Sequence, residues 1–156
     1  MSEENEMIFD PKIFYLKDSV FKGTLIPQIF FNKIEITTEM NISVNYSKVG
    51  DNPEGEMWNI LLTFTVIGKN AENSEVAYEI VSSYGGLFQI ANYKEEDIGK
   101  ICRVHCASVI FPYLREEIMN KVIKSGIPSI SIKPMNFSLM YENQIKEELL
   151  KKTEQS

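Results

Sequence analysis

The segment from Ile34 to Tyr46 alternates between apolar and polar residues with an unusually clean period of two. Successive side chains of a β-strand point to opposite faces of a sheet. One face of an extended segment here carries Ile34, Ile36, Met40, Ile42, Val44 and Tyr46, and the other carries Glu35, Thr37, Glu39, Asn41, Ser43 and Asn45. The segment is therefore predicted to be a strand with one face against a core.

Three other segments are predicted to be strands. Residues 12–22 are rich in aromatic and β-branched residues, and residues 76–83 are the last of the four strands. Polar turns at residues 50–55 and 68–75 separate the last three. The strand at residues 57–67 places its large apolar side chains on one side: Trp58, Ile60, Leu62, Phe64 and Val66. Consecutive strands joined by short turns favour an antiparallel meander over βαβ units.

The last third of the chain has helical spacing. Residues 95–109 precede Pro112, which suits the first position of a helix because its missing N–H would have no partner there. Gly126 ends that helix, and Asn136 can cap another. The first apolar stripe is Leu114, Ile118 and Val122, widened by Met119 and Ile123; the second is Phe137, Met140, Tyr141, Ile145 and Leu149.

These elements predict an α+β fold in a single domain spanning residues 1–156. A four-stranded antiparallel meander sheet comes first, and two to three helices follow it. We expect residues 1–7 and about 150–156 to be disordered, because both ends are strongly polar.

The charge of the chain disfavours several classes of partner. A formal net charge of −6 argues against a nucleic-acid backbone or an anionic membrane surface as the main partner. The first residues, MSEENE, are charged and lack the apolar stretch of a secretory signal, and no long apolar run follows. The sequence therefore predicts a cytoplasmic protein.

No catalytic constellation is recognisable. His105 is the single histidine, and although Cys102, His105 and Cys106 could face one another as metal ligands, zinc normally needs four. The CxxxC spacing is not the CxxC spacing of an activated thiolate. Gly85-Gly86 has no phosphate-loop context, so we expect it to permit a tight bend or a close backbone approach at a strand end. The sequence predicts neither an enzyme nor a cofactor or metal site.

Apolar residues outnumber the positions that two or three helices can cover. Residues 12–22 place apolar side chains on both faces, with Phe14, Leu16 and Val20 opposite Ile13, Tyr15 and Phe21. A monomer would expose more apolar area than is usual, so oligomerisation is predicted. Seven methionines, nine phenylalanines and seven tyrosines also suit adaptable apolar binding, although core packing explains most such residues equally well.

Residues 110–141 carry the most specific motif: IFPYLREEIMNKVIKSGIPSISIKPMNFSLMY. An FPY-R-E helix start, a Gly, a Pro, alternating apolar residues and a P-x-NF step follow one another in the order found in the SecB family of export chaperones. The resemblance extends upstream to about Met7 through EIVSSYGGLFQI and YLKDSVFKG. On these motifs the chain is similar to SecB proteins over nearly its whole length.

The resemblance implies a homotetramer, a dimer of dimers, that holds unfolded preproteins in hydrophobic grooves without nucleotide and passes them to the SecA motor. The client-binding residues that it implies are Ile34, Met40, Ile42, Tyr78, Ile80, Phe137, Met140 and Tyr141. It also implies that the helix starting at Pro112 lies between dimers, with Leu114, Ile118, Met119 and Val122 as candidate interface residues.

Docking of SecA is less clearly implied. In the family, acidic residues on the sheet surface bind a basic zinc-bearing tail of SecA. Asp18 matches one of these positions and Glu79 is near another, but Lys22 and Val81 stand where acidic residues are expected. Two alternatives remain open: a SecB-like chaperone that protects the antitoxin of a toxin–antitoxin system, and an oligomeric adaptor that binds one folded partner without chaperone activity.

Overall fold

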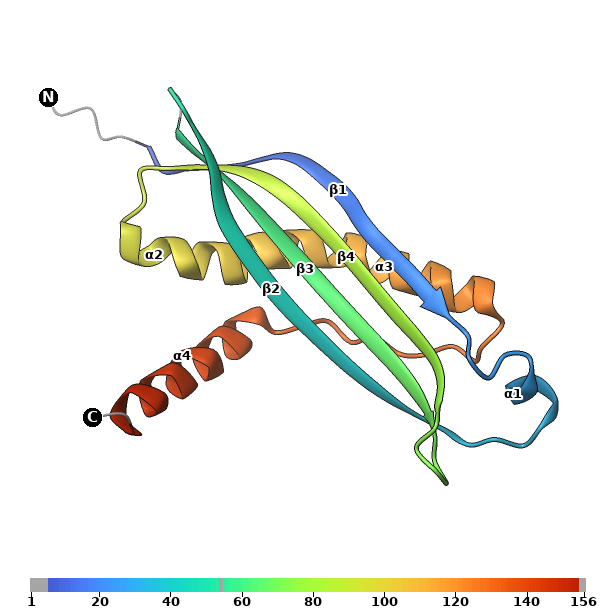
Figure 1. The fold of residues 1–156 in the computed structure, drawn as a ribbon. Coiled ribbons are helices and arrows are strands. Elements are labelled where there is room, and N and C mark those ends of the chain that lie inside the picture. Colours follow the sequence, from blue (N-terminus) through green and yellow to red (C-terminus); the bar gives the residue numbers. More distant parts are fainter. Residues whose placement is uncertain (1–5, 54, 155–156) are drawn as a thin grey trace, which may run out of the picture.

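A computed structural model describes residues 6–53 and 55–154. It is built on a single antiparallel sheet with strands β1 (Ile8–Lys22), β2 (Ile36–Asn52), β3 (Gly55–Asn70) and β4 (Val76–Ala91). The strand order across the sheet is β1-β4-β3-β2, and the strands twist together along their length (Figure 1). The predicted α+β fold, a four-stranded antiparallel sheet followed by helices, is confirmed.

The chain crosses from one edge of the sheet to the other between β1 and β2. Strands β2, β3 and β4 form a meander, whereas β1 pairs with β4 at the opposite edge. Residues 23–35 make the crossing and contain a one-turn helix, α1 (Gln28–Phe31), that was not predicted. The amide N of Leu25 donates to the carbonyl O of Ala77 at 2.9 Å, which ties the crossing segment to β4.

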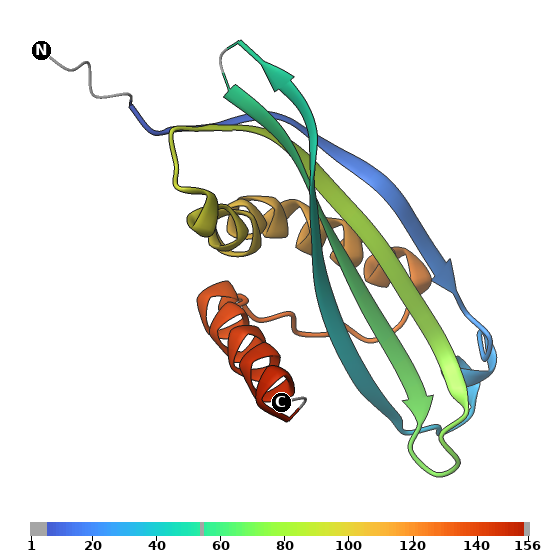
Figure 2. The same ribbon diagram turned by 60° about the vertical axis from the view of Figure 1, so that its left-hand side comes forward.

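One continuous helical rod covers the inner face of the sheet (Figures 1 and 2). The rod consists of α2 (Glu95–Lys100), a π-helical turn η1 (Ile101–Cys106) and α3 (Ala107–Ser125). It buries the predicted apolar side of β3 completely at Ile60, Leu62 and Val66. We call the opposite face, over which neither view shows a helix, the outer face.

Pro112 lies inside α3 and does not start it, so the predicted helix boundary is wrong. A proline inside a helix removes the hydrogen bond to the carbonyl four residues earlier, here that of Ser108. Both residues lie on the exposed side of the helix, where water can hydrate the freed carbonyl. The rod also changes to a π-helical turn just before this point. Pro112 therefore interrupts the hydrogen-bond pattern of α3 locally but does not end the helix.

The last helix, α4 (Phe137–Glu154), begins as predicted. The side chain of Asn136 accepts a hydrogen bond from the amide of Leu139 at 3.0 Å, which is an N-cap. Gly126, at φ 80°, ends α3 in the left-handed conformation. The helix continues through residues 150–154, where disorder was predicted; residues 1–5 and 155–156 lie outside the described part of the chain.

Two glycines of the sheet make room for aromatic rings. β4 continues through Gly85 and Gly86, so the predicted bend is wrong, but the predicted close approach is confirmed. A Cβ at Gly85 would lie 2.5 Å from the hydroxyl of Tyr15 on β1. Gly68 on β3 pairs with Tyr78 on β4, and the ring of Tyr78 occupies the space that a Cβ of Gly68 would need.

We expect Gly68→Ala to lower the free energy of unfolding by about 1–3 kcal/mol, because the added Cβ would clash with the buried ring of Tyr78, which would have to shift. Gly50→Ala is the matched control, since a Cβ there meets no atom within 4 Å. Urea unfolding of both variants measures the difference. Equal midpoints for Gly68→Ala and Gly50→Ala would contradict the packing described here.

Candidate polypeptide-binding groove

Three of the predicted client-binding residues, Tyr78, Ile80 and Phe137, belong to the core, and the first two lie on β4. Tyr78 is 3% exposed and Ile80 is 0% exposed, and both lie on the inner face of β4. β4 is a central strand, and α3 packs mainly on β4 and β3. The prediction that Tyr78 and Ile80 contact a client is therefore wrong for this conformation. The alternation of residues showed which face is apolar, but it could not show which strand is central.

The inner face of β2 is more open. β2 is an edge strand and has little contact with α3. Met40 is 41% exposed, while Ile42 and, just before the strand, Ile34 are half-buried. These three predicted residues lie where the rod leaves the sheet partly uncovered. They are the part of the predicted set that an incoming chain can reach along this edge.

An apolar pocket of about 580 Å³ opens between α3 and the segment that leads into α4. We call it the methionine pocket. Its lining consists of Ser108, Arg115 and Glu116 together with six apolar residues, Phe111, Pro112, Met119, Pro134, Met135 and Phe137. The rings of Phe111 and Phe137 meet edge to face, 5.7 Å between centroids. The unbranched side chains of two methionines can adapt to differently shaped apolar groups.

The methionine pocket adjoins the predicted residues of α4. Phe137 lines it with the little surface that the ring exposes, since this side chain is 3% exposed. Met140 and Tyr141 follow in the next turn and are half-buried against the core. The structure thus brings Phe137, Met140 and Tyr141 together at the start of α4, and it places Met119, a predicted interface residue, in the same pocket.

The other predicted interface residues have no surface to offer a second subunit. Leu114, Ile118 and Val122 are at most 1% exposed, because this side of α3 packs against the inner face of the chain's own sheet. Their assignment to a dimer–dimer interface is therefore wrong. A helix stripe that covers a sheet and a stripe that covers another helix have the same spacing in the sequence.

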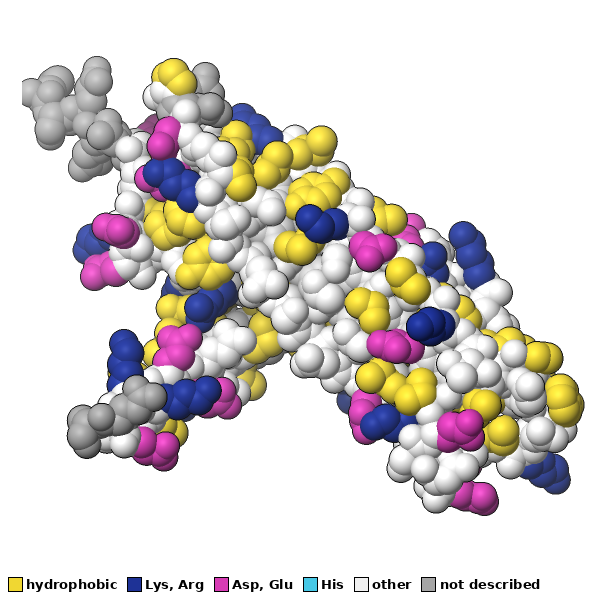
Figure 3. All heavy atoms as spheres, in the orientation of Figure 1, with side chains coloured by type: hydrophobic (Ala, Val, Ile, Leu, Met, Phe, Trp, Pro, Cys, Tyr) yellow, Lys and Arg dark blue, Asp and Glu magenta, His cyan; other side chains and the backbone are white. Residues whose placement is uncertain are grey.

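A second gap separates α4 from β2, and it is more polar. Its volume is about 290 Å³, and its lining residues are Val44, Arg103, Gln144, Glu147, Glu148 and Lys151. The space-filling view shows a notch between α4 and the lower part of the sheet (Figure 3). Sequence reasoning missed Arg103, Phe111 and Met135 as contributors to these sites. Each gap is lined by segments that are far apart in the chain, and no local sequence pattern predicts that these segments come together.

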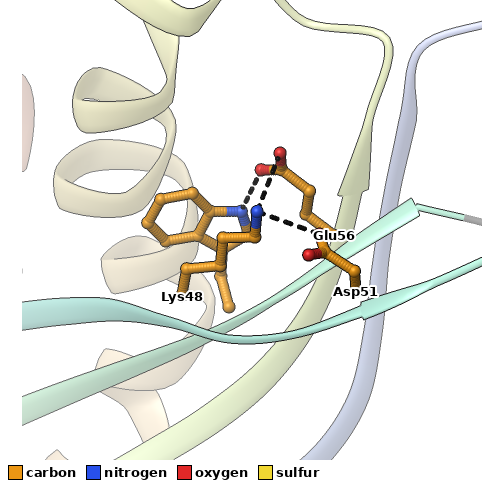
Figure 4. A network of polar contacts seen from close by, with 4 residues as sticks. Lys48, Asp51 and Glu56 are labelled. Atoms are coloured by element: carbon orange, nitrogen blue, oxygen red, sulfur yellow. Dashed lines mark hydrogen bonds and ion pairs between the residues drawn. The ribbon is translucent and has the colours of Figure 1, made fainter.

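A third cavity, of about 700 Å³, lies at the other end of β2 and includes Tyr46, Trp58 and Tyr93. Two of its charged groups, Lys48 and Glu56, belong to a network of polar contacts (Figure 4). The ammonium of Lys48 lies 2.9 Å from Asp51 and 3.4 Å from Glu56, and Trp58 donates its indole N–H to Glu56 at 3.1 Å. The hydrogen bond to Asp51 is the main cause that raises the pKa of Lys48. This mixed lining suits apolar polypeptide segments less well than the methionine pocket.

The predicted docking carboxylates lie on the outer face. Asp18 of β1 pairs with Ser83 of β4, and Glu79 lies four residues from Ser83 on β4. Asp18 and Glu79 are therefore on one face, with their Cα atoms roughly 14 Å apart. Lys22 pairs directly with Glu79 and lowers the local negative charge. Apolar side chains and both kinds of charge share this face (Figure 3). The docking residues and the methionine pocket are therefore on opposite sides of the sheet.

The cysteines do not form a reactive or metal-binding site with His105. Cys102 and Cys106 are fully buried, whereas His105 is exposed, so the three side chains do not converge. A hydrogen bond with Cys102, together with burial, raises the pKa of the Cys106 thiol, which disfavours the reactive thiolate. Within the described part of the chain, His, Cys, Asp and Glu form no group of three that could hold a metal. The same residues include no helix long and apolar enough to cross a membrane.

Comparisons with known proteins agree with this geometry. A family model described as preprotein translocase subunit SecB matches residues 2–148. The protein-export protein SecB of Neisseria meningitidis is 31% identical over 144 residues, which cover 92% of this chain and 95% of the relative. The SecB of Burkholderia mallei is 29% identical over 144 residues, covering 92% and 87% of the two chains.

One solved structure shares the fold. It is a SecB-like chaperone of Mycobacterium tuberculosis in complex with a ChAD peptide from the HigA1 antitoxin. It matches with a TM-score of 0.66 and 11% sequence identity, and covers 82% of this chain and 91% of that one. This likeness supports the fold, and the family match extends over most of the sequence. The chain belongs to the SecB family, a family of protein-export chaperones that is not a family of enzymes.

Proposed function

We propose that this protein is an ATP-independent holdase that binds unfolded preproteins and delivers them to the Sec translocase. The methionine pocket carries the proposal, because it is an open apolar site beside α4 in a member of an export-chaperone family. The binding surface also includes the open inner side of β2, at Ile34, Met40 and Ile42, and the half-buried Met140 and Tyr141 of α4. The sequence contains no phosphate-binding loop, so binding and release would follow affinity alone.

The proposed mechanism uses the hydrophobic effect without sequence readout. Each apolar client side chain that enters the methionine pocket leaves water, at about 25 cal/mol per Å² of buried area. One such contact is weak and reversible. Several contacts along one unfolded chain raise the total affinity through a high effective concentration. A folded protein hides the same side chains, so it would be released.

The methionine pocket is tested by Met135→Glu, which places a charge in the apolar lining. We expect the affinity for an unfolded client to fall about tenfold, equivalent to roughly 1.4 kcal/mol. Val49→Glu is the control, because Val49 is exposed on β2 and does not line this pocket. The readout is suppression of aggregation of an unrelated unfolded protein without ATP. If the wild-type protein gives no suppression at a severalfold excess, the holdase proposal fails and the adaptor alternative gains support.

We also propose that the protein assembles as a dimer of dimers. The exposed side of α3 carries a stripe with alternating spacings of four and three residues: Val109, Tyr113, Glu116, Asn120 and Ile123. This spacing suits helix–helix packing. β1 is an edge strand of the sheet and exposes Ile13, Leu16 and Val20. A long edge strand with apolar side chains favours pairing with a second copy.

We expect Ile123→Asp to convert tetramer into dimer, because this side chain is 73% exposed and a carboxylate would enter the proposed contact between helices. Light scattering measures the change. The wild-type protein should give four times the 17.9 kDa of one chain. Lys124→Asp is the control, because Lys124 is next to Ile123 in the chain but is not one of the stripe residues. An unchanged tetramer in Ile123→Asp would place the contact elsewhere.

The partner on the outer face is proposed to be SecA. Asp18 and Glu79 supply two carboxylates that a basic segment could bind. Their face is separate from the proposed client site, so SecA could dock while the client is still bound. The alternative partner is an antitoxin, suggested by the peptide bound to the mycobacterial structure. The export relatives are far closer in sequence, at 31% against 11% identity, so export is the favoured role.

Titration with the zinc-loaded basic tail of SecA tests this partner. We expect binding in low salt that weakens as salt rises, because exposed charges are screened. Asp18→Ala should weaken it severalfold, whereas Glu72→Ala, in the turn between β3 and β4, should not. A flat titration with the wild-type protein would remove SecA as the partner and leave the antitoxin role.

A further inference from the structure

α4 is attached to the rest of the molecule mainly near its start. Of its described side chains only Phe137 is buried, and its principal contact is with η1. Beyond the first turns the helix runs away from the sheet in Figure 1, and in Figure 2 it lies beside β2 with a gap between them. A helix with so little buried area needs a specific contact to hold a fixed direction, because packing alone would leave it free to swing.

Arg103 of η1 supplies that contact. Its guanidinium carbon lies 5.6 Å from the ring centroid of Tyr46 on β2 and 5.8 Å from that of Tyr141 on α4. Both distances fall within the range of cation–π attraction. One guanidinium nitrogen also lies 3.7 Å from the carboxylate of Glu148, a further two turns along α4. One side chain thus contacts the edge strand and two successive parts of α4.

The environment favours these contacts over hydration of the guanidinium. The Arg103 side chain is 24% exposed, so most of it is removed from water. A planar guanidinium can stack on aromatic rings and still use its edge for a carboxylate, which the ammonium of lysine cannot do. Of the charged groups that line the gap between β2 and α4, Glu148 is the one within ion-pair distance of Arg103.

We propose that Arg103 is a positioning residue that clamps α4 to β2 and so sets the width of the gap between them. The gap is lined by Val44 of β2, by Arg103 itself and by one side of α4. Tyr141, one of the proposed client-binding residues, is among the residues that the clamp holds. The effect on client binding rests on the proposed function, whereas the effect on α4 does not.

Loss of the clamp has a defined consequence for binding. Without Arg103, α4 samples several directions, and an arriving client must select or order one of them. Ordering a segment during binding reduces the observed affinity. Removal of the clamp should therefore weaken client binding although Arg103 is not itself an apolar contact. Loss of the Arg103 side chain should leave the sheet and α3 unchanged, because Arg103 is not one of the residues that form their core.

Hydrogen exchange of the free protein tests the clamp. We expect Arg103→Ala to accelerate amide exchange in residues 141–150 at least about fivefold, because the variant loses the contacts of the guanidinium with Tyr141 and Glu148. Arg103→Lys should give an intermediate rate, since it keeps the charge for Glu148 but not the stacking. Lys100→Ala, which removes a nearby exposed charge, should match the wild type. Unchanged exchange in Arg103→Ala, or equal acceleration in β3, would overturn the proposal.

Client titration with the same variants separates the clamp from the proposed function. We expect Arg103→Ala to bind an unfolded client about fivefold more weakly, with Arg103→Lys between it and the wild type. Faster exchange in α4 with unchanged client affinity would overturn the role of the clamp in binding. If even the wild-type protein binds no client, the proposed function fails, and the exchange result still decides whether Arg103 holds α4.

Discussion

The packing of α3 on the two central strands is the interaction on which the rest of the structure depends. Leu114, Ile118 and Val122 are fully buried in the core, where α3 packs on β3 and β4. A single helix is roughly 10 Å wide and covers about two strands, so a four-stranded sheet keeps an open edge. The half-buried inner side of β2 follows directly from this mismatch of widths.

The other binding features also arise from incomplete coverage. Phe111, whose ring also packs on Phe64 of β3, and the half-buried Met119 meet the segment before α4 to form the methionine pocket. α4 adds little to the core, so it depends on Arg103 for its position. The protein thus keeps a stable centre and leaves its adaptable apolar surface at the margin, where binding does not disturb the core.

The sheet also separates two kinds of surface. Its inner side and the helices supply apolar area, whereas Asp18 and Glu79 lie on the outer face beside Lys22. Under the proposed function, a client and a charged partner would therefore be held at once without competing for the same residues. Such a separation is what a carrier requires when it passes an unfolded chain to a second protein.

The amino-acid sequence by itself determined the strands, the apolar side of each strand, the Gly126 helix end and the Asn136 cap, because these follow from periodicity and from local backbone chemistry. The family followed too, from the motif at residues 110–141. Only the tertiary structure decided which apolar residues are accessible. Tyr78 and Met40 have equivalent places in the alternation, yet one lies on a central strand over Gly68 and the other on an open edge. Strand order and helix placement depend on contacts between segments that are distant in the sequence. Arg103 is an example, because only the fold brings its partners Tyr46 and Tyr141 next to it.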